Sequence, residues 1–486
     1  MIRWILTLVI LCLTTPVVAR EKAPDLVLTG QIVGADHQTY KPVTFEVPAG
    51  VTRVTVAFDY SGRDQKTVVD LGLMDPERFR GWSGGNKRSF SVATEDATPS
   101  YLPGPLPAGR WTLLLGIPNT RAATVAAFVA KVFFERGGGG AQAAPLRAGP
   151  GWYRGDLHAH TGHSDGSCQT QSGARAPCPV YRTAEAAAAR GLDFIAITDH
   201  NTTSHFEAMA ELQPAFDKLL LIPGREVTTF QGHANVFGPT AFIDFRLGDR
   251  AVPDVLTLQG LVEAAGGLFS INHPSAPSGE ACMGCGWTAT NTDYDKVQTI
   301  EVANGGSERA QGGAEGPLSG VAFWEAQLNA GHRITAIGGS DNHDAGLSPD
   351  VASSIGRPTT VVHAAELSTV GLLAALRAGR VFIDLDGTRD RMLDVSASTA
   401  RQTAVMGGAL AVRPGDRVTF SVAVSGAGPA SLEVVQDGAK RTPAFTGDRA
   451  FEIKMGDRPS WVRVNVRDPG GRLLLIGNPI YLTPAR

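Results

Sequence analysis

The sequence predicts an α/β protein in which a central domain of alternating helices and strands is flanked by two β-sandwich domains. Helical segments alternate with short apolar strands from about residue 151 to 390, which favours a parallel sheet or barrel. Short alternating apolar runs fill residues 25–136, and no convincing amphipathic helix separates these runs. Similar runs return in residues 391–486. A chain of 486 residues is also too long for one ordinary core.

Composition and charge narrow the class of protein. Hydrophobic residues make up 43% of the chain and charged residues 19%, which is typical of a globular protein. The formal net charge of −3 gives no electrostatic case for binding nucleic acid or an anionic membrane. We therefore expect a small-molecule partner and no nucleic acid.

Residues 1–19 are typical of a signal peptide. Arg3 supplies the positive charge, Ile5–Leu13 the apolar run, and Val17–Ala19 a small-residue cleavage site. The apolar run is short for a bilayer, so we expect no stable membrane insertion after cleavage; an uncleaved anchor is the alternative. The predicted location is periplasmic or secreted.

Four cysteines follow the signal, and an even number in an oxidising compartment indicates disulfides. The simplest pairing joins Cys168 to Cys178 and Cys282 to Cys285, although three connectivities are possible. A redox or zinc role for Cys282 and Cys285 is less favoured, because there is no second such pair and no thioredoxin-like strand before it. Both cysteine pairs are therefore expected to form disulfides that stiffen loops.

The flanking domains are predicted from short strands. In residues 25–136 these are Val43–Val47, Val51–Tyr60, Val68–Met74, Trp111–Ile117 and Val125–Phe134. They indicate a β-sandwich, and the Gly/Ala-rich residues 137–150 that follow are typical of a linker. Residues 391–486 predict a small immunoglobulin-like β-sandwich without histidine, so structural support is its expected role.

In the central domain, helices are followed by glycine and then by a buried strand. Thr183 is expected to cap a helix that ends at Gly191, before the strand Phe194–Thr198. The same pattern precedes other strands, namely Leu268–Asn272, Arg333–Ile337 and Arg380–Leu385. This repetition supports the prediction of a parallel sheet or barrel.

The stretch Gly155–Gly166 (GDLHAHTGHSDG) carries three histidines and two aspartates. If Leu157–Thr161 is a strand, its two-residue period puts His158 and His160 on one face. With Asp165 a short turn later, these imidazoles form half of a metal site. The alternative is a polar loop whose histidines bond to backbone and water.

Further potential ligands follow the predicted strands. The carboxyl ends of strands in a β/α barrel converge on one face, where active sites lie. Side chains far apart in the sequence are therefore expected to meet there: His158, His160, Asp165, His200, Glu226, His233, His273, Asp341 and His343. His163, Asp199 and Asp344 are candidates to orient the imidazoles, and Glu301 and Asn304 are expected to face the barrel mouth.

On these residues the central domain resembles the PHP (polymerase and histidinol phosphatase) superfamily of metal-dependent hydrolases. The motifs are DLHAHTGHSDG at 156–166, ITDHN at 197–201, GREVT at 224–228, GHAN at 232–235, NHP at 272–274 and GGSDNH at 338–343. The export signal and flanking β domains look most like the CehA/McbA branch, named after carbaryl hydrolases. The resemblance covers about half of the chain.

This resemblance implies a distorted (β/α)7 barrel that holds two to three divalent metal ions. The implied ligands are His158, His160, Glu226 and Asp341 for one ion, Glu226 as a bridge to a second ion with His233 and His273, and Asp165, His200 and His343 for a third. Mixed imidazole and carboxylate ligands suit zinc, manganese or iron rather than calcium.

The chemistry that this centre implies is hydrolysis by a metal-bridged hydroxide, with Glu226, His200 and Asp341 at the catalytic centre. A bridging carboxylate brings two cations to roughly 3.5–4 Å, where a shared water loses its proton near neutral pH. Phosphoesters are the first expected substrates. Arg225 is a candidate to bind an anionic substrate, or alternatively forms a salt bridge on the barrel rim.

Other functions stay open. A carboxylesterase or carbamate hydrolase with the same metal centre is one alternative, and a non-catalytic exported binding protein is another. A serine hydrolase is disfavoured because no Gly-x-Ser-x-Gly elbow lies between a strand and a helix.

Overall fold

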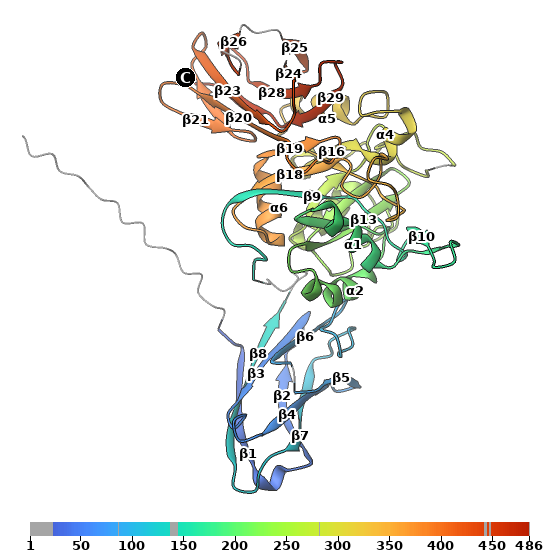
Figure 1. Cartoon of the computed structure of the whole chain (residues 1–486), viewed down its shortest axis with the longest axis vertical. Helices are drawn as coiled ribbons and strands as arrows, with labels where there is room; N and C mark the ends of the chain where they lie inside the picture. Colours follow the sequence, from blue (N-terminus) through green and yellow to red (C-terminus); the bar gives the residue numbers. More distant parts are fainter. Residues whose placement is uncertain are drawn as a thin grey trace, which may run out of the picture.

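The computed structural model describes residues 23–85, 87–136, 144–280, 282–441, 445–446 and 449–485. The predicted signal peptide and residues 137–143 of the predicted linker lie outside the described residues. Figure 1 shows the N-terminal strands at one end of the molecule and the C-terminal strands at the other, with most helices between them. Along the described residues, no helix is both long enough and apolar enough to cross a membrane.

Two four-stranded antiparallel sheets form the N-terminal part of the described chain. Their strand orders are β1-β8-β3-β6 and β2-β7-β4-β5. The strands are β1 (Leu26–Val33), β2 (Thr39–Val47), β3 (Arg53–Tyr60), β4 (Val68–Met74), β5 (Phe79–Ser83), β6 (Ser89–Ala93), β7 (Gly109–Asn119) and β8 (Val125–Glu135). The five strands predicted here correspond to β2, β3, β4, β7 and β8.

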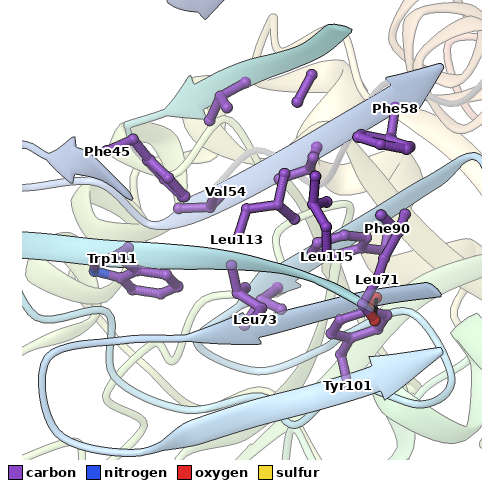
Figure 2. Packing of buried hydrophobic residues seen from close by; sticks show 14 of the residues in the cluster. Phe45, Val54, Phe58, Leu71, Leu73, Phe90, Tyr101, Trp111, Leu113 and Leu115 are labelled. Carbon is purple, nitrogen blue, oxygen red and sulfur yellow. Dashed lines mark hydrogen bonds between the residues drawn. The ribbon is translucent and has the colours of Figure 1, made fainter. Parts of the chain in front are cut away.

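Alternate residues of these strands point into a shared core. Trp111, Leu113 and Leu115 of β7 are fully buried, and they pack with Leu71 and Leu73 of β4 (Figure 2). Because side chains alternate between the two faces of a strand, every second position supplies the core. Burial of this apolar surface is the main force that holds the two sheets together.

The central domain is built on a mixed sheet in which seven strands stand side by side in chain order. They are β9 (Gly151–Asp156), β12 (Phe194–Ile197), β13 (Leu220–Thr229), β14 (Gly232–Phe237), β15 (Leu268–Ile271), β16 (Thr299–Asn304) and β17 (Thr335–Gly339). Most neighbours are parallel, as predicted, but β14 is antiparallel to both β13 and β15. Two residues join β13 to β14, too few for a parallel crossover, so an all-parallel sheet is ruled out here.

The sheet curls until β17 meets β18 (Thr359–Ala364), which pairs antiparallel with β9 and with β19 (Val381–Asp384). The hydroxyl of Thr360 joins β17 to β18. It accepts a hydrogen bond of 2.8 Å from the main-chain N–H of Gly338 and donates one of 2.6 Å to the carbonyl of the same residue. The curl brings the carboxyl ends of the strands around one centre.

In the part of the chain that the structure describes, six α-helices accompany this sheet: α1 (Val180–Arg190), α2 (His205–Leu212), α3 (Val255–Ala264), α4 (Gly305–Gln311), α5 (Val321–Asn329) and α6 (Thr369–Ala378). The predicted cap at Thr183 is wrong, because α1 begins after Pro179 and Thr183 is buried inside it. Gly191 ends α1 as predicted, with a left-handed φ of 73°. Asp254 and Ser368 cap α3 and α6 by accepting a backbone N–H.

The C-terminal strands extend the central sheet. β29 (Leu473–Gly477) pairs with β19, and the sheet continues through β28 (Ser460–Arg467). Its remaining strands are β24 (Ser431–Gln436), β25 (Ala439–Arg441), β30 (Ile480–Pro484) and β22 (Ala409–Val412). A second sheet holds β21 (Thr403–Val405), β20 (Met392–Ser398), β23 (Arg417–Ser425), β27 (Ala450–Lys454) and β26 (Phe445–Thr446). One buried cluster joins Phe382 of β19 to Phe420 and Phe451, so the C-terminal sandwich shares its core with the central domain.

Glu308 on α4 is a buried carboxyl group, and among the described residues its Oε1 has no hydrogen-bond partner. Burial raises its pKa from the ordinary 4.5 to about 8, against the opposing charge of Arg357. The folded chain therefore keeps a proton that the unfolded chain releases. This proton contributes stability that is complete below pH 4.5 and is lost as the pH rises to about 8.

The Glu308→Gln variant is expected to be more stable than the wild type at pH 9 and to lose this advantage at pH 5. Glutamine places a neutral group in the same buried position at every pH. Denaturant unfolding of both proteins at the two pH values measures the effect. An equal difference in unfolding free energy at pH 5 and pH 9 would contradict it.

Candidate metal centre

The nine side chains predicted as ligands gather at one edge of the central sheet, where the parallel strands end and the antiparallel β14 begins. Seven of them line one cavity of about 340 Å³: Asp165, His200, Glu226, His233, His273, Asp341 and His343. The other two, His158 and His160, are buried beside the same carboxylates. The structure therefore brings together the whole predicted set.

His158 and His160 lie just beyond the end of a strand. The predicted strand over Leu157–Thr161 is wrong, since β9 ends at Asp156 and the Asp156 carboxylate accepts the main-chain N–H of His158 at 3.1 Å. The two rings nevertheless meet one carboxylate. Oδ1 of Asp341 lies 3.3 Å from Nε2 of His158 and 3.2 Å from Nε2 of His160.

Glu226 is the carboxylate at the centre of the group, and it is 1% exposed. Its Oε1 lies 3.3 Å from Nε2 of His158 and 3.2 Å from Nε2 of His273. The same oxygen is 3.4 Å from Nδ1 of His233, and Oε2 is 2.8 Å from Nδ1 of His200. Nε2 of His160 follows at 3.8 Å from Oε2, so five imidazoles surround one carboxylate, which is suited to bridging two cations.

A second cluster lies on the open side of the cavity. Oδ1 of Asp165 is 3.3 Å from Nε2 of His343 and 3.6 Å from Nε2 of His200. One ligand atom from each of these three residues and from His160 lies within 4.8 Å of the others. The set implied for a third ion is thus present, with His160 as a further neighbour.

Three more groups have ligand atoms within 4.8 Å of one another: His158 with His160 and Glu226, His158 with His273 and Asp341, and His233 with His273 and Cys285. The sulfur of Cys285 is bonded in a disulfide, so it offers no thiolate. The remaining groups overlap, which suits several ions with shared ligands.

The donor set fits a divalent cation. Nε2 of His158 is buried and has no hydrogen-bond partner among the described residues, yet it lies 3.3 Å from both Glu226 and Asp341. A buried polar atom of this kind calls for a partner, and a cation among the carboxylates and imidazoles would supply one. The mixed donors suit zinc, manganese or iron.

The ionisable groups of this cluster shift one another's pKa values. Burial acts to raise the pKa of Glu226 and of Asp341, but the neighbouring imidazoles, His158 foremost, hold both values well below the usual range. Burial lowers the pKa of His160 to about 4. Both carboxylates are therefore ionised near neutral pH, while the imidazole of His160 is neutral and has a lone pair to offer.

Two candidate ligands have an unusual backbone conformation. The φ angle is +26° at His273 and +51° at Asp341, whereas residues other than glycine rarely have positive φ. Asn201, directly after His200, also has a φ of +51°. Such conformations cost roughly 1–3 kcal/mol each and are retained mainly where function needs them.

Glu301 lies beneath the group instead of at the mouth, where the sequence predicts it, and is 2% exposed. Its Oε1 accepts a hydrogen bond of 3.0 Å from Nδ1 of His158. Its Oε2 accepts one from the main-chain N–H of His273 and one from the amide of Asn304, both at 3.0 Å. Glu301 therefore fixes the His158 ring so that Nε2 faces the centre.

The Glu301→Gln variant is expected to bind metal roughly 10- to 100-fold more weakly, because a carboxylate that orients a ligand imidazole is lost. Competition with a chelator on folded protein measures this affinity. Glu263→Gln, on the exposed surface of α3 and 67% accessible, is the matched control and should bind as the wild type does. Equal affinity in Glu301→Gln and the control would contradict the assignment.

Two further neighbours were not predicted. The hydroxyl of Thr228 lies 2.6 Å from Nδ1 of His200, and the amide of Asn272 donates to Oε1 of Glu226 at 2.9 Å. Thr228 is two residues after Glu226 on β13, so the period of the strand was a signal that it shares the same face. Asn272 gave no comparable signal, because it follows the end of β15.

Arg225, predicted to bind an anionic substrate, is not among the residues that line the cavity. Adjacent residues of a strand point to opposite faces, so Glu226 faces the centre and Arg225 faces away. Its guanidinium is buried and donates to the carbonyls of Pro239 and Ala241 at 2.9 and 2.7 Å. Nor does it form a salt bridge among the described residues.

The three residues proposed to orient imidazoles contact other groups. Asp199 is buried and accepts from the backbone N–H and the hydroxyl of Thr161, both at 2.7 Å. His163 bonds to the Ser204 hydroxyl at 2.8 Å, and Asp344 pairs with Arg175. Within the described residues, none of the three bonds to a candidate ligand ring, so Asp199 stabilises the loop rather than the metal ligands.

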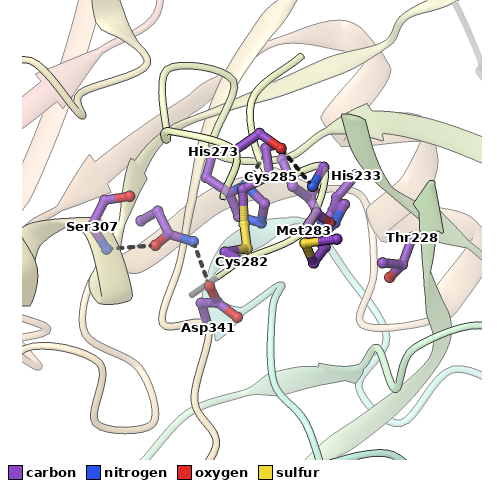
Figure 3. The surroundings of a disulfide bond; sticks show 12 residues. Thr228, His233, His273, Cys282, Met283, Cys285, Ser307 and Asp341 are labelled. Carbon is purple, nitrogen blue, oxygen red and sulfur yellow. Dashed lines mark hydrogen bonds between the residues drawn. A yellow bond between two sulfur atoms is a disulfide. The ribbon is translucent and has the colours of Figure 1, made fainter. Parts of the chain in front are cut away.

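Both expected disulfides are present, with Cα atoms 4.9 Å apart for Cys168–Cys178 and 5.6 Å apart for Cys282–Cys285. The first lies in the hairpin of β10 (Ser167–Gln169) and β11 (Arg175–Pro177). The second borders the cavity, where Cys282 is a lining residue (Figure 3). The simplest pairing is confirmed.

Comparisons with known proteins do not place the chain in a family. No family model matches it. No curated protein matches it either. Among solved structures, a candidate metal-dependent phosphoesterase from Bifidobacterium adolescentis is 16% identical with a TM-score of 0.28, covering 45% of this chain and 95% of that one. A β-glucuronidase from Parabacteroides merdae is 9% identical with a TM-score of 0.17, covering 96% of this chain and 65% of that one. At these TM-scores neither likeness supports a conclusion about this chain.

Proposed function

We propose that this chain is an exported metal-dependent hydrolase of the PHP type, most similar to the CehA/McbA branch, that cleaves esters, with phosphoesters as the first substrate class. The observation that carries the proposal is the buried Glu226 carboxylate, which five imidazoles surround beside an open cavity. Seven strands in chain order are compatible with a distorted (β/α)7 barrel. The two disulfides suit an exported protein.

In this proposal Glu226 would be shared between two ions. His158, His160 and Asp341 would hold one of them, and His233 with His273 would hold the other. Asp165, His200 and His343 would hold a third ion on the open side. Bound divalent ions would supply an activated water near neutral pH and a positive charge for the attacked ester.

The chain's own residues prepare the site for this chemistry. Glu226, Asp341 and His200 all line the cavity, which places them within reach of a bound ester. Thr228 and Glu226 both contact Nδ1 of His200, which leaves Nε2 directed toward Asp165. The protein thereby holds the ligands in place before a substrate arrives, and little reorganisation is needed at the moment of reaction.

A second substrate class is favoured by the lining of the cavity. Among the described residues that line it there is no lysine or arginine, and Met283, which is 62% exposed, adds an apolar group at its edge. A phosphoester would depend on the ions alone for charge neutralisation. A carboxyl ester or carbamate has no anionic group to neutralise and is the second candidate.

Metal analysis and a substrate panel test the proposal. Purified protein is expected to retain two to three divalent ions per chain and to hydrolyse a phosphomonoester or phosphodiester faster than an aryl ester or carbamate. The opposite order would favour the second class. Folded protein that retains no ion after incubation with zinc, manganese or iron would refute the proposal.

A further inference from the structure

We infer that the Cys282–Cys285 disulfide loop is a positioning device for one metal ion, because its main-chain carbonyls set the tautomer and the orientation of His233 and His273. The inference rests on the proposed metal centre and adds a role for residues that hold no metal themselves. The rings of the two histidines lie close to the loop and edge to face, with their centroids 5.2 Å apart (Figure 3).

Each of the two rings is held at both nitrogens. His233 directs Nδ1 toward Oε1 of Glu226 at 3.4 Å, while its Nε2 lies 3.1 Å from the carbonyl oxygen of Met283. His273 has the reverse arrangement, with Nε2 at 3.2 Å from Glu226 and Nδ1 at 3.2 Å from the carbonyl oxygen of Cys285. Both carbonyls belong to the short loop that the disulfide closes.

These contacts decide which nitrogen is free to bind a metal. A carbonyl oxygen only accepts, so the ring nitrogen beside it must carry the proton. In a neutral imidazole the other nitrogen then holds the lone pair. For both His233 and His273 that nitrogen faces Glu226, so the loop selects the tautomer that a metal ion shared with this carboxylate requires.

The disulfide and the packing of the loop keep the two carbonyls in place. Gly284, between Met283 and Cys285, has a φ of +78°, and a Cβ atom added there would lie 2.1 Å from the carbonyl oxygen of Thr229. The loop therefore rests directly on the turn that joins β13 to β14. Main-chain hydrogen bonds of 3.0 Å in both directions between Gly279 and Cys282 close its other side.

The second disulfide provides a matched control. In the described residues, the segment from Cys168 to Cys178 makes no hydrogen bond to a ring of the candidate ligands. The main-chain N–H of its neighbour Ser167 donates to the main-chain carbonyl of His343 at 2.8 Å and does not touch the ring. Removal of this bond leaves the His233 and His273 contacts intact. The main chain of Cys178 is hydrogen-bonded to Gly162 and Gly166 on either side of Asp165, so any effect of the removal falls on the ion of Asp165.

The test compares metal binding by the full-length wild type with that by Cys282→Ser/Cys285→Ser and Cys168→Ser/Cys178→Ser variants. Chelator competition should show the ion of His233 and His273 bound roughly 10- to 100-fold more weakly in the first variant only. Cobalt-substituted protein should lose the visible absorption of one site. Gly284→Ala keeps both cysteines but displaces the loop, so it should weaken the same ion if the serine variant fails to fold.

The outcomes separate this inference from the proposed function. A wild type that binds its full set of ions, together with folded Cys282→Ser/Cys285→Ser and Gly284→Ala variants of unchanged affinity and cobalt spectrum, would overturn the inference alone. Equal weakening in the Cys168→Ser/Cys178→Ser control would also overturn it. A wild type that binds no ion would refute the metal centre itself.

Discussion

Replacement of Glu226 by glutamine is expected to reduce hydrolysis by more than about 100-fold, the upper end of the loss seen when only a partner of a ligand is removed. The amide keeps the shape of the side chain and can still accept the hydrogen bond from Asn272. It removes the negative charge from the centre of five imidazoles, so cations lose their shared ligand. Folded protein should also contain fewer bound ions.

Kinetic assays on metal-loaded protein, elemental analysis and circular dichroism measure these three effects separately. Glu263→Gln removes the same charge from the exposed surface of α3 and should change none of them. Undiminished turnover in the Glu226→Gln variant would contradict the proposed mechanism.

Replacement of Phe382 by alanine is expected to destabilise the protein by about 3–5 kcal/mol. Phe382 on β19 is fully buried, and its ring packs 5.4 Å from that of Trp152, in the cluster that also holds Phe420 and Phe451 of the C-terminal sandwich. A cavity at this position weakens the central and C-terminal parts together. Both are therefore expected to unfold in one transition at a lower denaturant concentration.

Denaturant unfolding followed by circular dichroism and by tryptophan fluorescence measures this change. Phe230→Ala removes an aromatic ring that is 86% exposed and should alter stability by no more than about 0.5 kcal/mol. Two separate transitions in Phe382→Ala, one of them unchanged from the wild type, would contradict a shared core.

The candidate metal ligands could be predicted from the sequence alone, because their residue types are those that bind metal ions. Histidines and carboxylates at strand ends are rare enough as a set to reveal a centre, and all nine lie together. The orientation of Arg225 was also within reach, because a strand that turns Glu226 inward must turn its neighbour outward. The two-residue period of the strand therefore predicts which way the Arg225 side chain points better than its position next to Glu226 does.

Other features of the site and the fold depend on contacts between distant parts of the chain, which a local sequence pattern does not predict. The carbonyls of Met283 and Cys285 are main-chain atoms, which every residue has. Their contacts with the two histidines therefore cannot be predicted from the residue types. Glu301 looks like a residue at the mouth until the curl of the sheet places it under His158. The pairing of β19 with β29 joins segments almost a hundred positions apart, and side-chain alternation says nothing about such partners.

The pairing of β19 with β29 also bears on how this protein can be divided. A chain cut after β19 would expose a row of unpaired N–H and C=O groups along a buried, apolar strand of the sequence VFID. Open edges of this kind recruit other chains and promote aggregation. The C-terminal strands therefore act as a cover for that edge, and an isolated central domain should precipitate even though it retains every candidate metal ligand.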